Sequence, residues 1–182
     1  SIKLTLEKSI VETLGKYGYK DGSSPVFIQC FEVGALKRLH KMTSIKLIQL
    51  LEEDNKPYDL VEAKDPRKPA DLLTPEGLAE IATYAEGIGP SKNLILPRYK
   101  DGKLLKPTKL VAEAHKVGLV VHPWTFRNEN SFLPLELRSK PDDTSDSAGL
   151  YGDGLAEYRL FYDLGVDGVF SENPDTAIEA RP

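Results

Sequence analysis

Chemically capable side chains are concentrated in one short stretch, His122 to Arg127, which reads His-Pro-Trp-Thr-Phe-Arg. This stretch supplies an imidazole, an indole, a hydroxyl and a guanidinium. An imidazole can exchange a proton near neutral pH, and a guanidinium can bind a phosphate through two parallel hydrogen bonds. We therefore expect any site in this chain to centre on these residues.

Each of these side chains also has a purely structural interpretation. His122 can contact a ligand from the end of a strand, or it can bond to a neighbouring carbonyl group. Trp124 lies two residues on, so it should share a face with His122 and can form an apolar wall or fill the core. Arg127 can bind a phosphate, although a surface ion pair at the start of a loop is the simpler expectation.

Two glutamines lie in otherwise apolar segments, where a buried amide must be hydrogen-bonded. We expect Gln29 to line the site and Gln49 to have a structural role. The other two histidines, His40 and His115, lie beside lysines in helical patterns, and we expect both to be solvated. Lys92 can attract an anion, but a solvated lysine is again the simpler expectation.

Acidic residues near the C-terminus receive structural interpretations. Asn173-Pro174-Asp175 has the pattern of a helix start, which we prefer to a phosphate-binding loop after the last strand. The acidic residues between 142 and 153 lack the regular ligand spacing of a calcium-binding loop. We therefore expect a solvated loop there.

Short apolar runs alternate with helical patterns along the chain. The apolar runs are typical of buried strands and cover residues 26–31, 45–51, 86–90, 118–121 and 166–171. Helical patterns cover residues 2–17, 34–40, 74–85, 104–117, 154–164 and 174–180, with a polar surface loop expected at 54–69. The alternation predicts an α/β fold, either an open sheet or a (β/α)8 barrel. In both, functional side chains gather at the C-terminal ends of parallel strands.

Composition is that of an ordinary globular protein, with 40% hydrophobic and 29% charged residues among 182, and we expect a single domain over 1–182. The net charge of -4 gives no reason to expect nucleic acid or an anionic membrane as a partner. We expect neither a signal peptide nor a membrane span, since no apolar run approaches roughly 20 residues. Cys30 is the single cysteine, which excludes an intrachain disulfide and a cysteine-based zinc cluster. Glycine-rich nucleotide-binding fingerprints are absent from the sequence.

Five segments in order resemble the glycerophosphodiester phosphodiesterase family, in the form of its larger, periplasmic-type members. They are residues 27–31 with 36–39, 46–51, 86–90, 122–127 and 165–175. The resemblance covers almost the whole chain, from the family's fourth strand to its closing strand.

This resemblance implies a (β/α)8 TIM-barrel type of fold and the hydrolysis of glycerophosphodiesters to an alcohol and glycerol 3-phosphate, in lipid and glycerol metabolism. In that family a divalent cation, calcium or magnesium, is held by acidic residues, and a pair of histidines performs acid–base catalysis. The resemblance favours a periplasmic or secreted location, with the cytoplasm as the alternative.

Four motifs of the family have no match in the expected strands of this chain: His-Arg-Gly, the Glu-x-Asp metal pair, the second catalytic histidine and Glu-x-Lys. All belong to the family's first three strands, so we expect about five of eight β/α units here, a partial barrel. The resemblance then implies substrate contacts from His122, Trp124, Arg127 and Gln29, and no catalytic or metal-binding residue in this chain. We expect the chain alone to be inactive, and to self-associate or to pair with the missing N-terminal part.

Two alternatives stay open. One is a non-catalytic α/β module that binds a partner or a small polyol. The other is an unrelated barrel enzyme acting on a sugar phosphate, such as an isomerase or an aldolase. An aldolase needs a lysine at the end of a strand, whereas Lys46, the only lysine within an expected strand, lies near its start.

Overall fold

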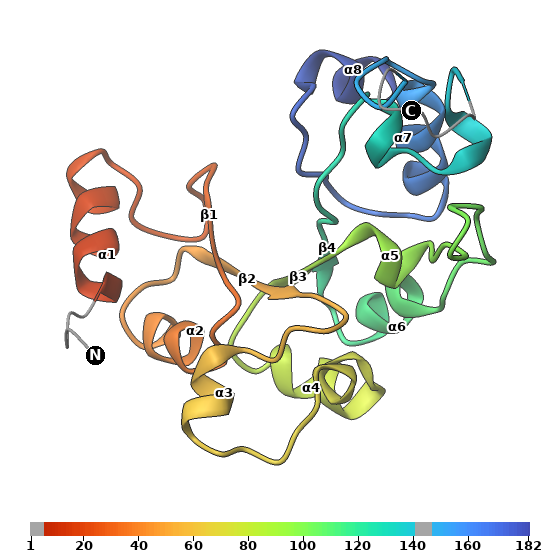
Figure 1. Ribbon diagram of the computed structural model, residues 1–182. Helices are drawn as coiled ribbons and strands as arrows, with labels where there is room; N and C mark the ends of the chain where they lie inside the picture. The colour runs from red at the N-terminus through yellow and green to blue at the C-terminus, as the bar shows by residue number, and fades with distance from the viewer. Residues whose placement is uncertain (1–5, 141–146) are drawn as a thin grey trace. The chain divides into compact units, whose positions relative to one another are not determined.

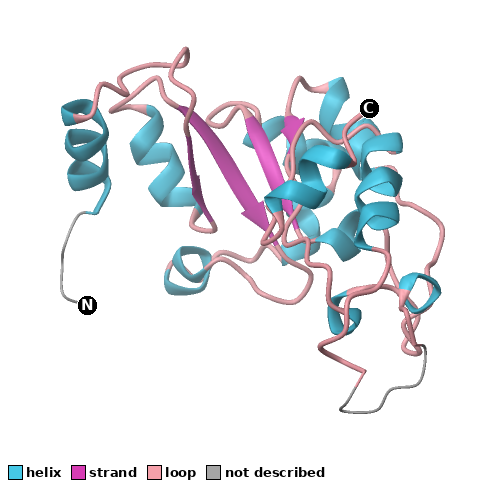
Figure 2. Cartoon of the chain, turned by 90° about the horizontal axis from the view of Figure 1, so that it is seen from above, coloured by secondary structure: helices cyan, strands magenta, loops and turns pink. Residues whose placement is uncertain are grey.

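The computed structural model describes residues 6–140 and 147–182, which form two compact units (Figures 1 and 2). Unit 1 contains the residues up to 89 together with 116–119, and unit 2 contains residues 90–115 and 120–182. Strands alternate with helices in both units. The prediction of an α/β protein is therefore confirmed, and the expectation of a single domain over the whole chain stays a prediction.

Unit 1 is built on three neighbouring strands, β1 (Phe27–Cys30), β2 (Lys46–Leu51) and β3 (Gly87–Pro90), in that order; the last residue of β3, Pro90, is the first residue of unit 2. β1 and β2 pair in parallel, with Ile28 opposite Leu47 and Cys30 opposite Gln49. Because side chains alternate along a strand, Ile28 and Leu47 share one buried face.

Unit 1 has one helix before β1 and three more between its strands. They are α1 (Leu6–Lys16), α2 (Val33–His40), α3 (Tyr58–Glu62) and α4 (Pro75–Ile81), with a 3-10 turn at Pro69–Leu73. α2 directs Leu36 and Leu39 into the core. α4 begins as the sequence predicts, because the Thr74 hydroxyl accepts a hydrogen bond from the Gly77 N–H at 3.0 Å. None of the side chains of α1 is fully buried.

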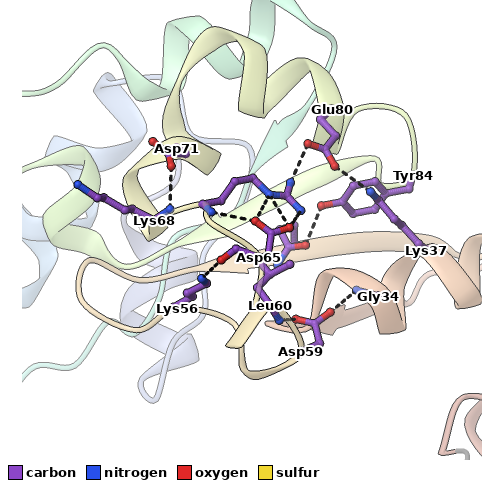
Figure 3. Close-up of polar contacts among 12 residues, drawn as sticks. Gly34, Lys37, Lys56, Asp59, Leu60, Asp65, Lys68, Asp71, Glu80 and Tyr84 are labelled. Carbon is purple, nitrogen blue, oxygen red and sulfur yellow. Dashed lines mark hydrogen bonds and ion pairs between the residues drawn. The ribbon is translucent and has the colours of Figure 1, made fainter. Parts of the chain in front are cut away.

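The expectation of a surface loop at 54–69 is wrong over Tyr58–Glu62, which forms a helix. This segment contains α3, whose Leu60 is buried, and an ionic network fixes the residues after it. The Arg67 guanidinium binds the Asp65 carboxylate at 2.9 Å and Glu80 at 2.8 Å, and Glu80 also binds Lys37 at 2.8 Å. Figure 3 shows Asp65, Glu80 and Lys37 converging in this way. Contacts between residues far apart in the sequence hold the segment, and a polar composition does not reveal them.

Unit 2 contains the short strand β4 (Val120–Val121) and the extended residues that follow it. Trp124 bonds on one side to Pro90 and Lys92, and Phe126 bonds on the other side to Phe170. Its helices are α5 (Lys92–Ile95), α6 (Leu110–Lys116), α7 (Gly154–Asp163) and α8 (Pro174–Glu179), with 3-10 turns at Asn130–Phe132 and Leu135–Leu137. Segment 120–126 therefore lies between residues 90–92 and 167–172, with parallel bridges to both.

Two elements of unit 2 are shorter than the sequence predicts. The helix expected at 104–117 begins only at Leu110, because Leu104 pairs with Arg98 in an antiparallel turn. The last strand, expected at 166–171, keeps only a single bridge, Phe126 to Ser171. The Asp167 carboxylate accepts the Val121 N–H at 2.8 Å, so a side chain takes a position that a ladder hydrogen bond would otherwise occupy.

The core of unit 2 centres on Phe126, which is fully buried. Its ring stacks on Tyr158 at 4.7 Å and meets Phe161 edge-on at 4.9 Å, both from α7. Such aromatic pairs stabilise a fold beyond the area that they bury. They fix the C-terminal end of the 120–126 segment against α7. No helix within residues 6–140 and 147–182 has the length and apolarity that crossing a bilayer requires.

Candidate functional site

Backbone hydrogen bonds on both sides position the segment from His122 to Arg127. The Trp124 N–H donates to the Pro90 carbonyl at 3.1 Å, and the Trp124 carbonyl accepts from the Lys92 N–H at 3.1 Å. On the other side, the Phe126 N–H donates to the Phe170 carbonyl at 2.8 Å. The Trp124–Thr125 peptide bond is cis. These bonds hold the segment at the end of β4, as the sequence predicts.

His122 lies against Gly168 on the neighbouring segment. A β-carbon at Gly168 would lie 2.9 Å from Cδ2 of the imidazole, so the ring occupies the space that a side chain at residue 168 would need. Burial lowers the pKa of His122, and the negative charge of Asp167 opposes this shift. A neutral imidazole carries one hydrogen-bond donor and one acceptor, which suits contact with a hydroxyl or a phosphate.

Arg127 takes part in two contacts. Its guanidinium lies 4.4 Å from the centre of the Phe132 ring, and its Nη2 lies 3.4 Å from the Glu172 carboxylate. The expected ion pair is therefore present, but Glu172 is exposed, and such surface pairs contribute little. Stacking uses the face of the guanidinium, while hydrogen bonds to an anion use its edge.

Trp124 is partly exposed, and it is the only tryptophan of the chain. It therefore places one fluorescent reporter within the candidate site. The substrate contacts expected of His122, Trp124 and Arg127 stay predictions. All three residues come from one segment of unit 2.

Gln29, the fourth expected contact, belongs to unit 1. It is exposed on β1 and borders a cavity of about 330 Å³ between α1 and α2. Apolar residues of both helices line this cavity together with charged ones, among them Ile10, Leu39, Glu32 and Asp59.

The structural role expected of Gln49 is confirmed. Its side chain is fully buried, and its Nε2 donates to the carbonyls of Phe31 at 2.8 Å and Leu50 at 3.1 Å. Its Oε1 accepts a hydrogen bond from the Tyr84 hydroxyl at 2.9 Å. The amide thus ties the end of β1 to β2 and to the residues after α4.

The sequence analysis does not predict a buried ionic cluster in unit 2. The expectation that Lys92 is solvated is wrong, because its side chain is buried. Its Nζ binds both Glu157 oxygens, at 2.8 and 2.9 Å. Arg98 binds the same carboxylate at 2.8 Å. Burial raises the pKa of Glu157 and lowers that of Lys92, while the attraction between their charges opposes both shifts.

One local signal points to this cluster. Glu157 lies one turn before the buried Phe161 on α7, so it falls on the apolar face of that helix. A carboxylate on an apolar face requires a buried partner. Lys92 also stands at the strand end where an aldolase would place its amine. Its Nζ is occupied by Glu157, which disfavours the aldolase alternative.

The remaining polar residues discussed from the sequence can be compared with their observed environments. His40 and His115 are both exposed, as expected, and the His115 imidazole also lies 2.9 Å from the Asp167 carboxylate. α8 begins at Pro174, which confirms the interpretation of Asn173-Pro174-Asp175 as a helix start. Of the acidic loop at 142–153, residues 142–146 lie outside the described part, and Asp153 accepts a hydrogen bond from the Ala156 N–H at the start of α7.

No divalent-cation site is formed by the side chains in residues 6–140 and 147–182. Three or more His, Cys, Asp or Glu side chains do not converge anywhere in this part of the chain. The paired carboxylates Glu32 and Asp59 instead accept backbone N–H groups at the starts of helices. The side chains of residues 6–140 and 147–182 therefore do not fit a bound metal ion.

Comparison with known proteins supplies the family. Residues 2–176 match the sequence profile of the glycerophosphoryl diester phosphodiesterase family. The chain is 37% identical to a glycerophosphodiester phosphodiesterase of Arabidopsis thaliana over 91% of its own length and 42% of that protein. It is 26% identical to a glycerophosphodiester phosphodiesterase of Haemophilus influenzae, over 93% of this chain and 45% of that protein. For a Treponema pallidum protein of the same name the identity is 24%, over 91% of this chain and 46% of the relative.

The chain thus spans less than half the length of these three relatives. It belongs to the glycerophosphoryl diester phosphodiesterase family, and its β/α units are part of a fold of the (β/α)8 barrel type.

Proposed function

We propose that this chain is the substrate-binding part of an enzyme that hydrolyses glycerophosphodiesters to an alcohol and glycerol 3-phosphate. The observation that carries the proposal is the segment His122 to Arg127, held between residues 90–92 and 167–172 at the end of β4. The names of the relatives from Arabidopsis thaliana and Haemophilus influenzae support the activity.

Three side chains of the segment contact the substrate in this proposal. Arg127 binds the phosphate with the edge of its guanidinium. Trp124 forms an apolar wall beside the carbon atoms of the glycerol. His122 exchanges hydrogen bonds with a glycerol hydroxyl or a phosphate oxygen as a contact residue, not as the acid or base. Gln29 is proposed as a fourth contact.

Catalytic groups come from elsewhere in this proposal. The sequence lacks the His-Arg-Gly motif that the family uses for acid–base catalysis, and its one Glu-x-Asp, Glu52-Glu53-Asp54, follows β2 and not one of the family's first three strands, where the pair for the divalent cation, calcium or magnesium, belongs. The complete enzyme would take these groups from a further segment, for which the greater length of the relatives leaves room. We also propose a periplasmic or secreted location, on the resemblance to the larger members of the family.

A partner for unit 1 is part of the same proposal. β1 exposes Phe27 to the extent of 44%, although it is a strand residue in a hydrophobic run. The cavity of about 330 Å³ next to β1 has apolar walls from α1 and α2. Pairing with the segment that carries the catalytic groups, or self-association, would cover these surfaces.

Fluorescence of Trp124 tests the proposed binding. We expect glycerol 3-phosphate to change its emission saturably. Replacement Arg127→Ala should weaken this binding about tenfold or more, because a hydrogen bond to a charged group contributes about 1.5–3 kcal/mol. Arg159→Ala is the matched control, since Arg159 is an exposed arginine of α7. Equal weakening by both replacements, or no saturable change in the unaltered chain, would refute the proposal.

A further inference from the structure

Glu157 carries the only carboxylate that Lys92 and Arg98 bind in the described part of unit 2. The side chain of Glu157 is 1% exposed, that of Lys92 10% and that of Arg98 18%. Both cations bond to the same oxygen, Oε1, at 2.9 and 2.8 Å. Two cations therefore share one buried anion, an arrangement in which the anion holds together groups that would otherwise repel each other.

From this cluster a continuous series of contacts leads to the candidate site. Arg98 Nη1 donates to the Phe132 carbonyl at 3.0 Å, and Lys92 Nζ approaches the same oxygen at 3.4 Å. The ring of Phe132 in turn lies 4.4 Å from the guanidinium of Arg127. Glu157 is thus connected to Arg127 through two cations and one aromatic residue.

Lys92 also contacts the other end of the site segment. Its backbone N–H bonds to the Trp124 carbonyl at 3.1 Å, and its Nζ lies 4.9 Å from the centre of the Phe126 ring. A displacement of Lys92 would therefore disturb residues before Arg127 in the sequence, Trp124 and Phe126, and also Phe132 after it. α7 presents Glu157 to this segment from a position 65 residues away from Lys92 in the sequence.

We infer that Glu157 is a positioning residue, which fixes Phe132 through Lys92 and Arg98 and so sets the direction in which Arg127 presents its guanidinium to the substrate phosphate. The last clause rests on the proposed function of Arg127. The geometric part, from Glu157 to Arg127, does not depend on any ligand.

The sign of the effect separates positioning from simple electrostatics. A nearby carboxylate repels an anionic ligand, so its neutralisation alone would strengthen the binding of a phosphate. Loss of positioning has the opposite consequence, because Arg127 would then adopt several orientations. In Glu157→Gln we therefore expect about three- to tenfold weaker binding of glycerol 3-phosphate, the size of typical coupling between residues connected in this way.

NMR of the full chain tests the geometric part without a ligand. The Phe132 ring should change the chemical shift of the Arg127 guanidinium signal. Arg127→Lys assigns this signal, because the signal disappears in that variant. Phe132→Leu gives the chemical shift that the signal has without the ring. In Glu157→Gln we expect the signal to move toward that position. Glu80→Gln is the matched control, since Glu80 is also shared by two cations, Lys37 and Arg67, in unit 1. It should leave the signal in place.

Two further variants keep the test decisive. Glu157→Asp retains the charge and should leave the signal between those of the unaltered chain and Glu157→Gln. If Glu157→Gln does not fold, Arg98→Met removes one connection and should move the signal in the same direction by less. An unmoved Arg127 signal in a folded variant, or tighter binding of glycerol 3-phosphate by Glu157→Gln, would overturn the inference. A moved signal without any phosphate binding by the unaltered chain would refute the proposed function alone.

Discussion

Replacement of Gln49 by leucine should destabilise unit 1 by about 2–4 kcal/mol. The change would remove two short hydrogen bonds, one from the buried Tyr84 hydroxyl at 2.9 Å and one to the partly buried Phe31 carbonyl at 2.8 Å. A buried polar group without a partner costs about 1–3 kcal/mol. Removal of the buried amide itself offsets part of this cost, which brings the net value to the lower half of the range.

A double-mutant cycle isolates the contribution of the Gln49–Tyr84 hydrogen bond. Tyr84→Phe alone should cost about 1 kcal/mol, since it leaves the Gln49 carbonyl oxygen without a donor. In Gln49→Leu/Tyr84→Phe both partners are absent, so the cost should fall below the sum of the single changes by about 0.5–3 kcal/mol. Gln29→Leu is the matched control, because Gln29 is an exposed glutamine of β1, and it should change stability by less than about 0.5 kcal/mol.

Urea unfolding followed by circular dichroism measures these differences. A shift of the midpoint at constant slope reports a change in the free energy of unfolding. Emission of Trp124, recorded in parallel, reports unit 2. If Gln49→Leu is as stable as Gln29→Leu, or if the two single costs add without interaction, the structural role assigned to Gln49 is refuted.

Two further predictions concern His122. Gly168→Ala should cost about 1–3 kcal/mol, because its β-carbon would approach the imidazole to 2.9 Å, whereas Gly149→Ala has open space and should be nearly neutral in urea unfolding. Burial lowers the pKa of His122 below its ordinary value of about 6.5, so the folded state binds the proton less readily than the unfolded state. Its contribution to stability should be complete above pH 6.5 or so and be lost as the pH falls toward the lowered pKa. Unfolding midpoints between about pH 7 and pH 5 should therefore fall more steeply for the unaltered chain than for His122→Asn. Equal slopes, or equal costs for the two glycine changes, would contradict the placement of the imidazole.

Local patterns identify most of the elements in this chain. The apolar run at 45–51 becomes β2, and the helical pattern at 154–164 becomes α7. The helix expected at 104–117 fails at its first turns, because Leu104 finds an antiparallel partner in Arg98 and Pro107 lacks the N–H that a helix interior needs. Propensity is local, and here a turn contact outweighs it.

In the candidate site, too, some features follow from the local sequence and others depend on distant residues. The place of His122 to Arg127 follows from a strand pattern and its end, both of which are local. The environment of Lys92 does not, because its partner Glu157 comes from another helix. A lysine in isolation is best expected in solvent, and only the folded chain brings the carboxylate to it.

In the proposed function this chain supplies a substrate-facing wall, while the catalytic groups lie in another segment. Incubation of the 182-residue chain alone with glycerophosphocholine, in calcium and in magnesium, tests it most directly. We expect no release of glycerol 3-phosphate in either solution. Metal-dependent release that disappears on addition of a chelator would contradict it.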